Sequence, residues 1–200
     1  MIFAKVNAES ADSVIANKYG VIGYPTFVLT DSKGVEVDRI IGYRDAEVFL
    51  QTINDYQHGI GTLEAMVMEA DTNENRQLYF DIGDKYKYRK MPAEAEPWYQ
   101  KALALGSPTD SLAGEVRFAI ADMYRRNHEY DKAIEAYKKI ELEFSGSKIA
   151  EYAGIYIPIA FRYKDDTAAA IIAFEDYLKN YPEGEDIDYA KEQIEILKGN

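Results

Sequence analysis

A spacing that recurs three times constrains the fold of this 200-residue chain more than any other feature. In each of three segments, an aromatic residue is followed nine positions later by alanine and four positions after that by a second aromatic residue. The alanines are Ala95, Ala133 and Ala170, so the pattern advances by 38 and then by 37 residues. A small residue is needed where two helices cross closely, and aromatic side chains fill the space on either side. The spacing therefore predicts three antiparallel helix pairs that bury their apolar faces by stacking.

The three segments resemble tetratricopeptide repeats, although their period exceeds the usual length of about 34 residues. The positions that carry the resemblance are Tyr79, Ile82, Gly83, Tyr86, Ala95, Tyr99 and Ala102, then Ile120, Ala121, Tyr124, Ala133, Tyr137 and Ile140, then Ile157, Phe161, Ala170, Phe174 and Tyr177. A closing helix is expected over Asp186–Leu197, with Tyr189, Ile194 and Leu197 facing inward. Pro158 is expected to kink the first helix of the third segment or to delay its start.

The first sixty residues follow a different pattern, in which short runs of β-forming residues alternate with helical ones. We expect first a strand over Ile2–Val6 and then a helix from Ser10 or Asp12 to about Tyr19, with Gly20 left-handed after it. Two strands follow, over Thr26–Thr30 and Val35–Ile41, joined by a turn at 31–34. A helix over Asp45–Gln57 ends this part. Beyond them, a short apolar helix is expected over Leu63–Ala70, and Asp71 or Thr72 is expected to cap the next one.

This order, with the run Tyr19–Phe27 at its centre and Gly42-Tyr43 after the last strand, resembles the C-terminal half of thioredoxin. The resemblance implies a cis proline at Pro25. Two interpretations of Tyr24, Pro25 and Thr26 follow: they form a turn that maintains the fold, or they retain the ability to contact a peptide. The expected fold class is thus an α/β thioredoxin-like half-domain over residues 1–60 and an all-α TPR superhelix over 61–200, helix-dominated overall.

The half of thioredoxin that carries Cys-x-x-Cys has no counterpart in this chain, which leaves a gap in the expected sheet. Unpaired strand edges invite another chain. Three outcomes are open: the sequence lacks part of a longer parent, which we favour, the half-domain closes by forming a homodimer through the incomplete sheet, or the sheet repacks.

The composition excludes several kinds of chemistry. With no cysteine, the chain has no disulfide, thiolate metal ligand or dithiol redox centre. The two histidines, His58 and His128, lie far apart without ligand spacing, and we expect no metal, cofactor or catalytic residue. A net charge of −12 disfavours nucleic acid and anionic membranes as partners. No apolar run is long enough to insert into a membrane. As written, the chain is expected to be soluble and cytoplasmic, or periplasmic if an upstream signal is missing.

Basic and aromatic residues recur at the ends of the first helices of the three pairs, at positions that line the groove in the tetratricopeptide family. They are Lys87, Tyr88, Arg125, Arg126, Arg162 and Tyr163. Such a stripe can bind the carboxylates of a protein or peptide partner, including an acidic one. Alternatively, these cations are there because the dipole favours positive charge at the end of a helix.

The sequence therefore favours a redox-inactive scaffold or adaptor that binds a segment of a partner protein in its groove, and not an enzyme. One alternative is a truncated thiol-disulfide oxidoreductase or redox chaperone. Another is a structural unit that dimerises through the open sheet.

Overall fold

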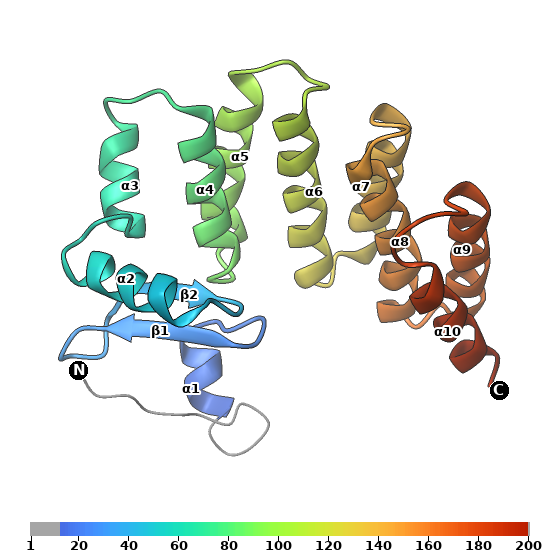
Figure 1. Ribbon diagram of the computed structural model, residues 1–200, viewed down its shortest axis with the longest axis horizontal. Coiled ribbons are helices and arrows are strands. Elements are labelled where there is room, and N and C mark those ends of the chain that lie inside the picture. The colour runs from blue at the N-terminus through green and yellow to red at the C-terminus, as the bar shows by residue number, and fades with distance from the viewer. Residues whose placement is uncertain (1–12, 200) are drawn as a thin grey trace. The chain divides into compact units, whose positions relative to one another are not determined.

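The computed structural model describes residues 13–199, which form ten helices and one two-stranded antiparallel sheet (Figure 1). The chain divides into two compact units, residues 1–102 and residues 103–200. The strand expected over Ile2–Val6, and the caps expected at Ser10 or Asp12, lie outside the described residues.

The hairpin of the first unit was predicted almost to the residue. Strand β1 (Thr26–Thr30) pairs with β2 (Glu36–Ile41), which begins one residue later than expected. Helix α1 (Ser13–Lys18) precedes them, and Gly20 after it has the left-handed φ of 57° that the sequence predicts. In the turn, the carboxylate of Asp31 accepts hydrogen bonds from the amides of Lys33 and Val35, which determines where the second strand starts.

Helix α2 (Ala46–Gln57) packs against the hairpin. It starts where expected because the side chain of Asp45 accepts a hydrogen bond from the amide of Val48. Its Phe49 meets Phe27 of β1 edge-on, with 4.7 Å between ring centroids. Buried Ile40 of β2 and Ile53 of α2 complete this small apolar core.

The next helices are α3 (Leu63–Ala70), α4 (Arg76–Lys87) and α5 (Pro92–Ala104). The prediction for α3 is confirmed, but the expected cap of α4 at Asp71 or Thr72 is wrong. Asp71 ends α3, and Asn75 caps α4 by accepting a hydrogen bond from Leu78 at 3.0 Å. Several neighbouring residues have side chains that can cap a helix, and the packing of the helix decides which of them does so.

The first helix pair is packed as the repeat predicts. Ala95 and Tyr99 of α5 are fully buried. A side chain on Gly83 of α4 would lie 2.6 Å from the ring of Tyr99, so the two helices approach as closely as a glycine allows.

The second unit contains α6 (Ser111–Arg126), α7 (Tyr130–Glu143), α8 (Lys148–Tyr163), α9 (Thr167–Asn180) and α10 (Ile187–Lys198). Each helix contacts the next, and α6 also contacts α8. Ala133 and Ala170 are fully buried, which confirms the predicted register of the second and third pairs. The closing helix is confirmed as α10, whose Tyr189, Ile194 and Leu197 pack against buried Phe174 and Tyr177.

Pro158 does not delay the start of its helix, so this part of the expectation was wrong, whereas the expected kink stays a prediction. Helix α8 begins at Lys148, where Ser147 caps it, and continues past Pro158 to Tyr163. A proline removes one amide donor, and here the surrounding residues of α8 are buried against neighbouring helices. We attribute the continuity of the helix to this packing, because tertiary contacts supply most helical stability.

Candidate functional site

Two of the predicted groove arginines meet on one buried carboxylate at the end of α6. Nη2 of Arg125 and Nε of Arg126 both lie 2.6 Å from the carboxylate of Asp122. Asp122 is only 6% exposed. Burial alone would raise the pKa of Asp122, but the guanidinium groups of Arg126 and Arg125 more than offset it, so the pKa lies below the ordinary value. The carboxylate is therefore ionised at neutral pH and holds both arginines in place.

Helix α8 brings aromatic rings against these cations. The guanidinium carbon of Arg125 lies 5.4 Å from the ring centroid of Tyr156 and 5.6 Å from that of Tyr163. Arg162 lies 5.6 Å from the same Tyr163 ring, and its Nη1 donates a hydrogen bond to Oε1 of Gln193 in α10. Two guanidinium groups thus lie close to the Tyr163 ring, an arrangement that cation–π attraction stabilises.

We refer to Asp122, Arg125, Arg126, Tyr156, Arg162 and Tyr163 as the Arg125 cluster. It combines three guanidinium groups with one carboxylate, so the cluster itself is positive although the chain carries a net charge of −12. Tyr163 is 49% exposed, and its ring also stacks on Tyr130 with the planes 10° apart. Guanidinium groups beside exposed aromatic rings are suited to bind carboxylates and apolar side chains of another protein.

Lys87 and Tyr88, the predicted groove residues of the first unit, lie in different surroundings. Lys87 is 7% exposed, and its Nζ lies 2.8 Å from the carboxylate of Asp84 and 4.6 Å from the ring centroid of Tyr88. The ammonium group thus has a partner within its own helix. A role for these two residues in binding stays a prediction.

All the predicted basic residues lie in the last turns of their helices. This position is also what the helix dipole favours.

The Tyr24–Pro25 peptide bond is cis, as the thioredoxin resemblance implies. The carbonyl of Pro25 accepts a hydrogen bond from the amide of Gly42 at 2.9 Å, and the hydroxyl of Thr26 donates to the carbonyl of Gly23 at 2.7 Å. These are contacts within the hairpin and its loop. They support the interpretation as a turn that maintains the fold, while the peptide contact stays a prediction.

A buried charge network in the first unit was not predicted from the sequence. Asp38 is fully buried, and its carboxylate accepts hydrogen bonds from Lys85 at 2.9 Å, from Arg89 at 2.8 Å and from the amide of Leu63 at 2.6 Å. Glu36 lies 2.9 Å from Arg89. The only available signal was the pair of charges inside a strand, Asp38 and Arg39, because isolated buried charges are costly and need partners.

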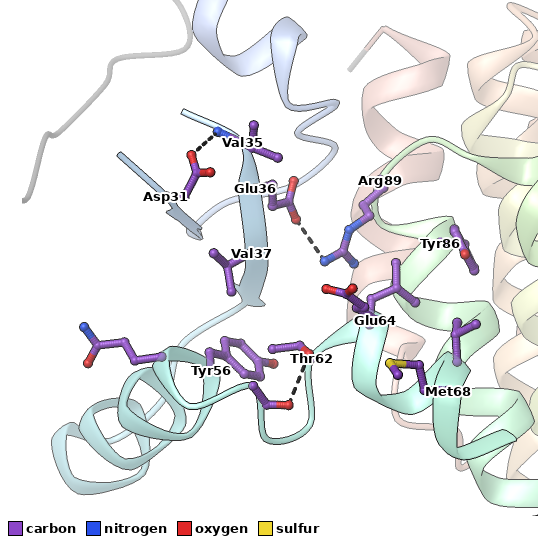
Figure 2. A pocket seen from close by; sticks show the side chains of 14 residues that line it. Asp31, Val35, Glu36, Val37, Tyr56, Thr62, Glu64, Met68, Tyr86 and Arg89 are labelled. Carbon is purple, nitrogen blue, oxygen red and sulfur yellow. Dashed lines mark hydrogen bonds and ion pairs between the residues drawn. The ribbon is translucent and has the colours of Figure 1, made fainter. Parts of the chain in front are cut away.

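Beside this network lies a hollow with a volume of about 860 Å³ (Figure 2). Figure 2 shows Val35, Glu36 and Val37 of the hairpin on one side and Glu64 and Met68 of α3 on the other. The guanidinium group of Arg89 in its wall is engaged by Glu36, Asp38 and the carbonyl of Lys85. The lining has no histidine, cysteine or serine.

Within residues 13–199, no group of three or more potential ligands is arranged to hold a metal ion. His58 caps the end of α2 and His128 lies in the turn after α6, both at helix ends. In this part of the chain, no helix is long and apolar enough to cross a membrane.

Comparisons with known proteins agree with the repeat fold. A family model described as YfiO, outer membrane lipoprotein, matches residues 116–191. A solved structure, described as the crystal structure of MamA, is similar with a TM-score of 0.54 and 16% sequence identity, over 79% of this chain and 85% of that one. A comparison with curated proteins found no sequence that matches this chain.

The chain is therefore a TPR-like helical repeat protein with a small two-stranded antiparallel hairpin. Neither match concerns the thioredoxin family, and the described residues form a hairpin and not a thioredoxin sheet.

Proposed function

We propose that this chain is a non-catalytic scaffold that binds an acidic segment of a partner protein at the Arg125 cluster. The observation that carries the proposal is the excess of guanidinium groups over carboxylates on α6 and α8, next to the exposed ring of Tyr163. TPR-like folds expose such surfaces to protein partners, and the fold here is of that type.

The physical basis is a charge-assisted contact beside an aromatic anchor. A carboxylate of the partner forms hydrogen bonds with Arg126, whose side chain is 28% exposed, while its apolar groups pack on Tyr163. A hydrogen bond to a charged group contributes about 1.5–3 kcal/mol. Removing one such contact therefore weakens binding by roughly 10- to 100-fold.

The test uses a short fluorescent peptide of alternating glutamate and leucine, with a glutamine version as the uncharged probe. We expect the full chain to bind the glutamate peptide more tightly, with an affinity that falls as salt is added. Arg126→Gln should weaken this binding, whereas Lys139→Gln, which changes an exposed lysine of α7, should leave it unchanged. Equal binding of both peptides, or no effect of Arg126→Gln in a folded variant, would refute the proposal.

For the cellular setting, we propose the cell envelope, in agreement with the periplasmic option above. The support is the description of the matching family as outer membrane lipoproteins. Fractionation of the source cells with an antibody to the chain tests this, and recovery in the cytoplasmic fraction alone would contradict it.

We further propose that residues 1–60 form a thioredoxin-like half-domain and that residues 61–200 form the repeat domain. The support is the order helix, strand, hairpin turn, strand, helix over residues 13–57. The second candidate function, a thiol-disulfide oxidoreductase or redox chaperone of which this chain is a part, depends on this proposal. Sequencing the gene upstream of Met1 tests it: an in-frame Cys-x-x-Cys favours the redox function, and an upstream stop codon rules it out.

A further inference from the structure

Strand β1 has an edge that is open within the part of the chain that the structure describes. The amide of Gly42 donates to the carbonyl of Pro25. Along two antiparallel strands, residues that bond to the partner strand alternate with residues that do not. Counting from Pro25, the amides and carbonyls of Phe27 and Leu29 therefore point toward β2. The backbone groups of Thr26, Val28 and Thr30 then point away from β2. Among residues 13–199, no group from outside the hairpin bonds to the backbone of these three residues.

The outer edge of β2 differs, because the backbone groups of Arg39 already have partners there. The amide of Arg39 donates to Oδ1 of Asp38 at 2.7 Å, and its carbonyl accepts a hydrogen bond from the hydroxyl of Tyr56 at 3.4 Å. Charged side chains also line β2, at Glu36, Asp38 and Arg39. Edge strands are commonly protected from pairing in this way, and β1 carries no such charge.

A hollow of about 430 Å³ follows the whole of β1 and reaches α2. On this face Phe27 is 43% exposed although it packs on Phe49. An added strand that presents apolar side chains on the same face would cover Phe27 and fill the hollow. The occupant therefore needs an uncharged strand with large apolar residues at alternate positions.

We propose that the occupant is β1 of a second copy of this chain, paired antiparallel about a two-fold axis at Val28. The sequence Thr-Phe-Val-Leu-Thr is self-complementary about that residue. Thr26 then faces Thr30 of the other copy, Phe27 faces Leu29, and Val28 faces its own equivalent. Thr26, Val28 and Thr30 each exchange a pair of backbone hydrogen bonds with the other copy, and the apolar pairs Phe27–Leu29 lie on the side of α2.

The size and charge of the contact predict its strength. A pairing of two five-residue strands is small beside a standard interface of about 1,600 Å², so the dimer depends on concentration. Each chain carries a net charge of −12, and two chains repel one another. Added salt screens this repulsion and strengthens the dimer, whereas it weakens the binding of an acidic peptide proposed above. The two proposals can therefore fail independently.

Charge substitutions at the two-fold axis give the first test. In the dimer, residue 28 lies opposite itself, so Val28→Lys and Val28→Glu each place like charges together and should abolish association in analytical ultracentrifugation. An equimolar mixture of the two variants should associate again. Circular dichroism establishes that each variant is folded. A wild-type chain that stays monomeric up to millimolar concentration at high salt overturns the proposal, as does a mixture of folded variants that does not associate.

Cross-linking gives a second test that leaves the hairpin nearly unchanged. The chain has no cysteine, so a single Val28→Cys introduces the only thiol. Residues that face each other in a hydrogen-bonded pair have Cα atoms about 5.5 Å apart, which suits a disulfide. Val28→Cys should therefore form a covalent dimer under mild oxidation. Thr30→Cys, which faces Thr26 of the other copy, should not, and equal cross-linking of both variants would contradict the proposed register.

Discussion

The guanidinium group of Arg89 lies 2.8 Å from the carboxylate of Asp38, although the two residues are 51 positions apart in the chain. Asp38 comes from the hairpin, and Arg89 follows the first helix of the first repeat. Lys85 and the amide of Leu63, the first residue of α3, both donate to the other oxygen of this carboxylate. One buried aspartate thus connects the hairpin to the helices of the first unit.

We expect Asp38→Asn to destabilise the first unit. The substitution leaves Lys85 and Arg89 without their anionic partner in a buried site, and breaking a buried ion pair in this way costs about 3–5 kcal/mol. Urea unfolding followed by circular dichroism measures the change in free energy. Glu96→Gln, at an exposed position of α5, is the matched control and should be neutral. A loss below about 1 kcal/mol would show that the network is not important for stability.

Stability should fall in acid, and Asp38 should be one of the groups responsible. Burial alone would raise the pKa of Asp38, but Lys85 and Arg89 more than offset it, so the folded pKa lies below the ordinary value of 3.8. A carboxyl with a lowered folded pKa stabilises the protein above its unfolded pKa, and this contribution is lost as the pH falls through the folded pKa. Unfolding free energies measured from pH 7 downward should therefore decrease below about pH 4, and less steeply in Asp38→Asn. Parallel curves for the two proteins would contradict this.

Gly83→Ala should test the close helix contact of the first pair. The new methyl group would lie 2.6 Å from the ring of Tyr99, which is fully buried and whose hydroxyl donates to Asp84 at 2.6 Å. Because the ring has little room to move, we expect a loss of about 1–3 kcal/mol in unfolding free energy. Gly23→Ala is the control, since no atom lies within 4 Å of its added methyl group. Equal stabilities of the two variants would count against the tight contact.

Asp122→Asn separates the two interpretations of the groove arginines. If Arg125 and Arg126 bind an acidic partner, removing the carboxylate that they share should raise the affinity for the glutamate–leucine peptide by about tenfold, while stability falls. Asp165→Asn is the control, because this exposed turn residue has a φ of 62° that asparagine also adopts. Lower stability with unchanged affinity would indicate that the arginines serve only the end of the helix.

The helical part of the fold could be predicted from the sequence because its information is local and repeated. Ala95, Ala133 and Ala170 recur at nearly equal steps, and all three are fully buried. The period of an amphipathic helix and the need for a small residue at a crossing are properties of neighbouring residues, so they can be recognised without coordinates. The hairpin and the closing helix could also be predicted, because turn residues and the spacing of apolar residues are local features.

The charged contacts could not be predicted, because they join residues that the sequence separates. The pairing of Asp38 with Lys85 and Arg89 depends on how the hairpin packs on α3 and α4. Lys87 and Arg126 occupy similar positions at helix ends, yet the side chain of the first is 6% exposed and that of the second 28%. The cap at Asn75 was not predicted either, since Asp71 and Thr72 also have side chains that can cap a helix.

By itself, the sequence determined which segments are helices, where the helices of a pair cross and which residues must be buried, because hydrophobic periodicity and side-chain size act over a few turns. Only the tertiary structure decided which charges are buried in ion pairs and which stay exposed. The energy of an ion pair depends on distance and burial in three dimensions, and neither quantity follows from separation along the chain.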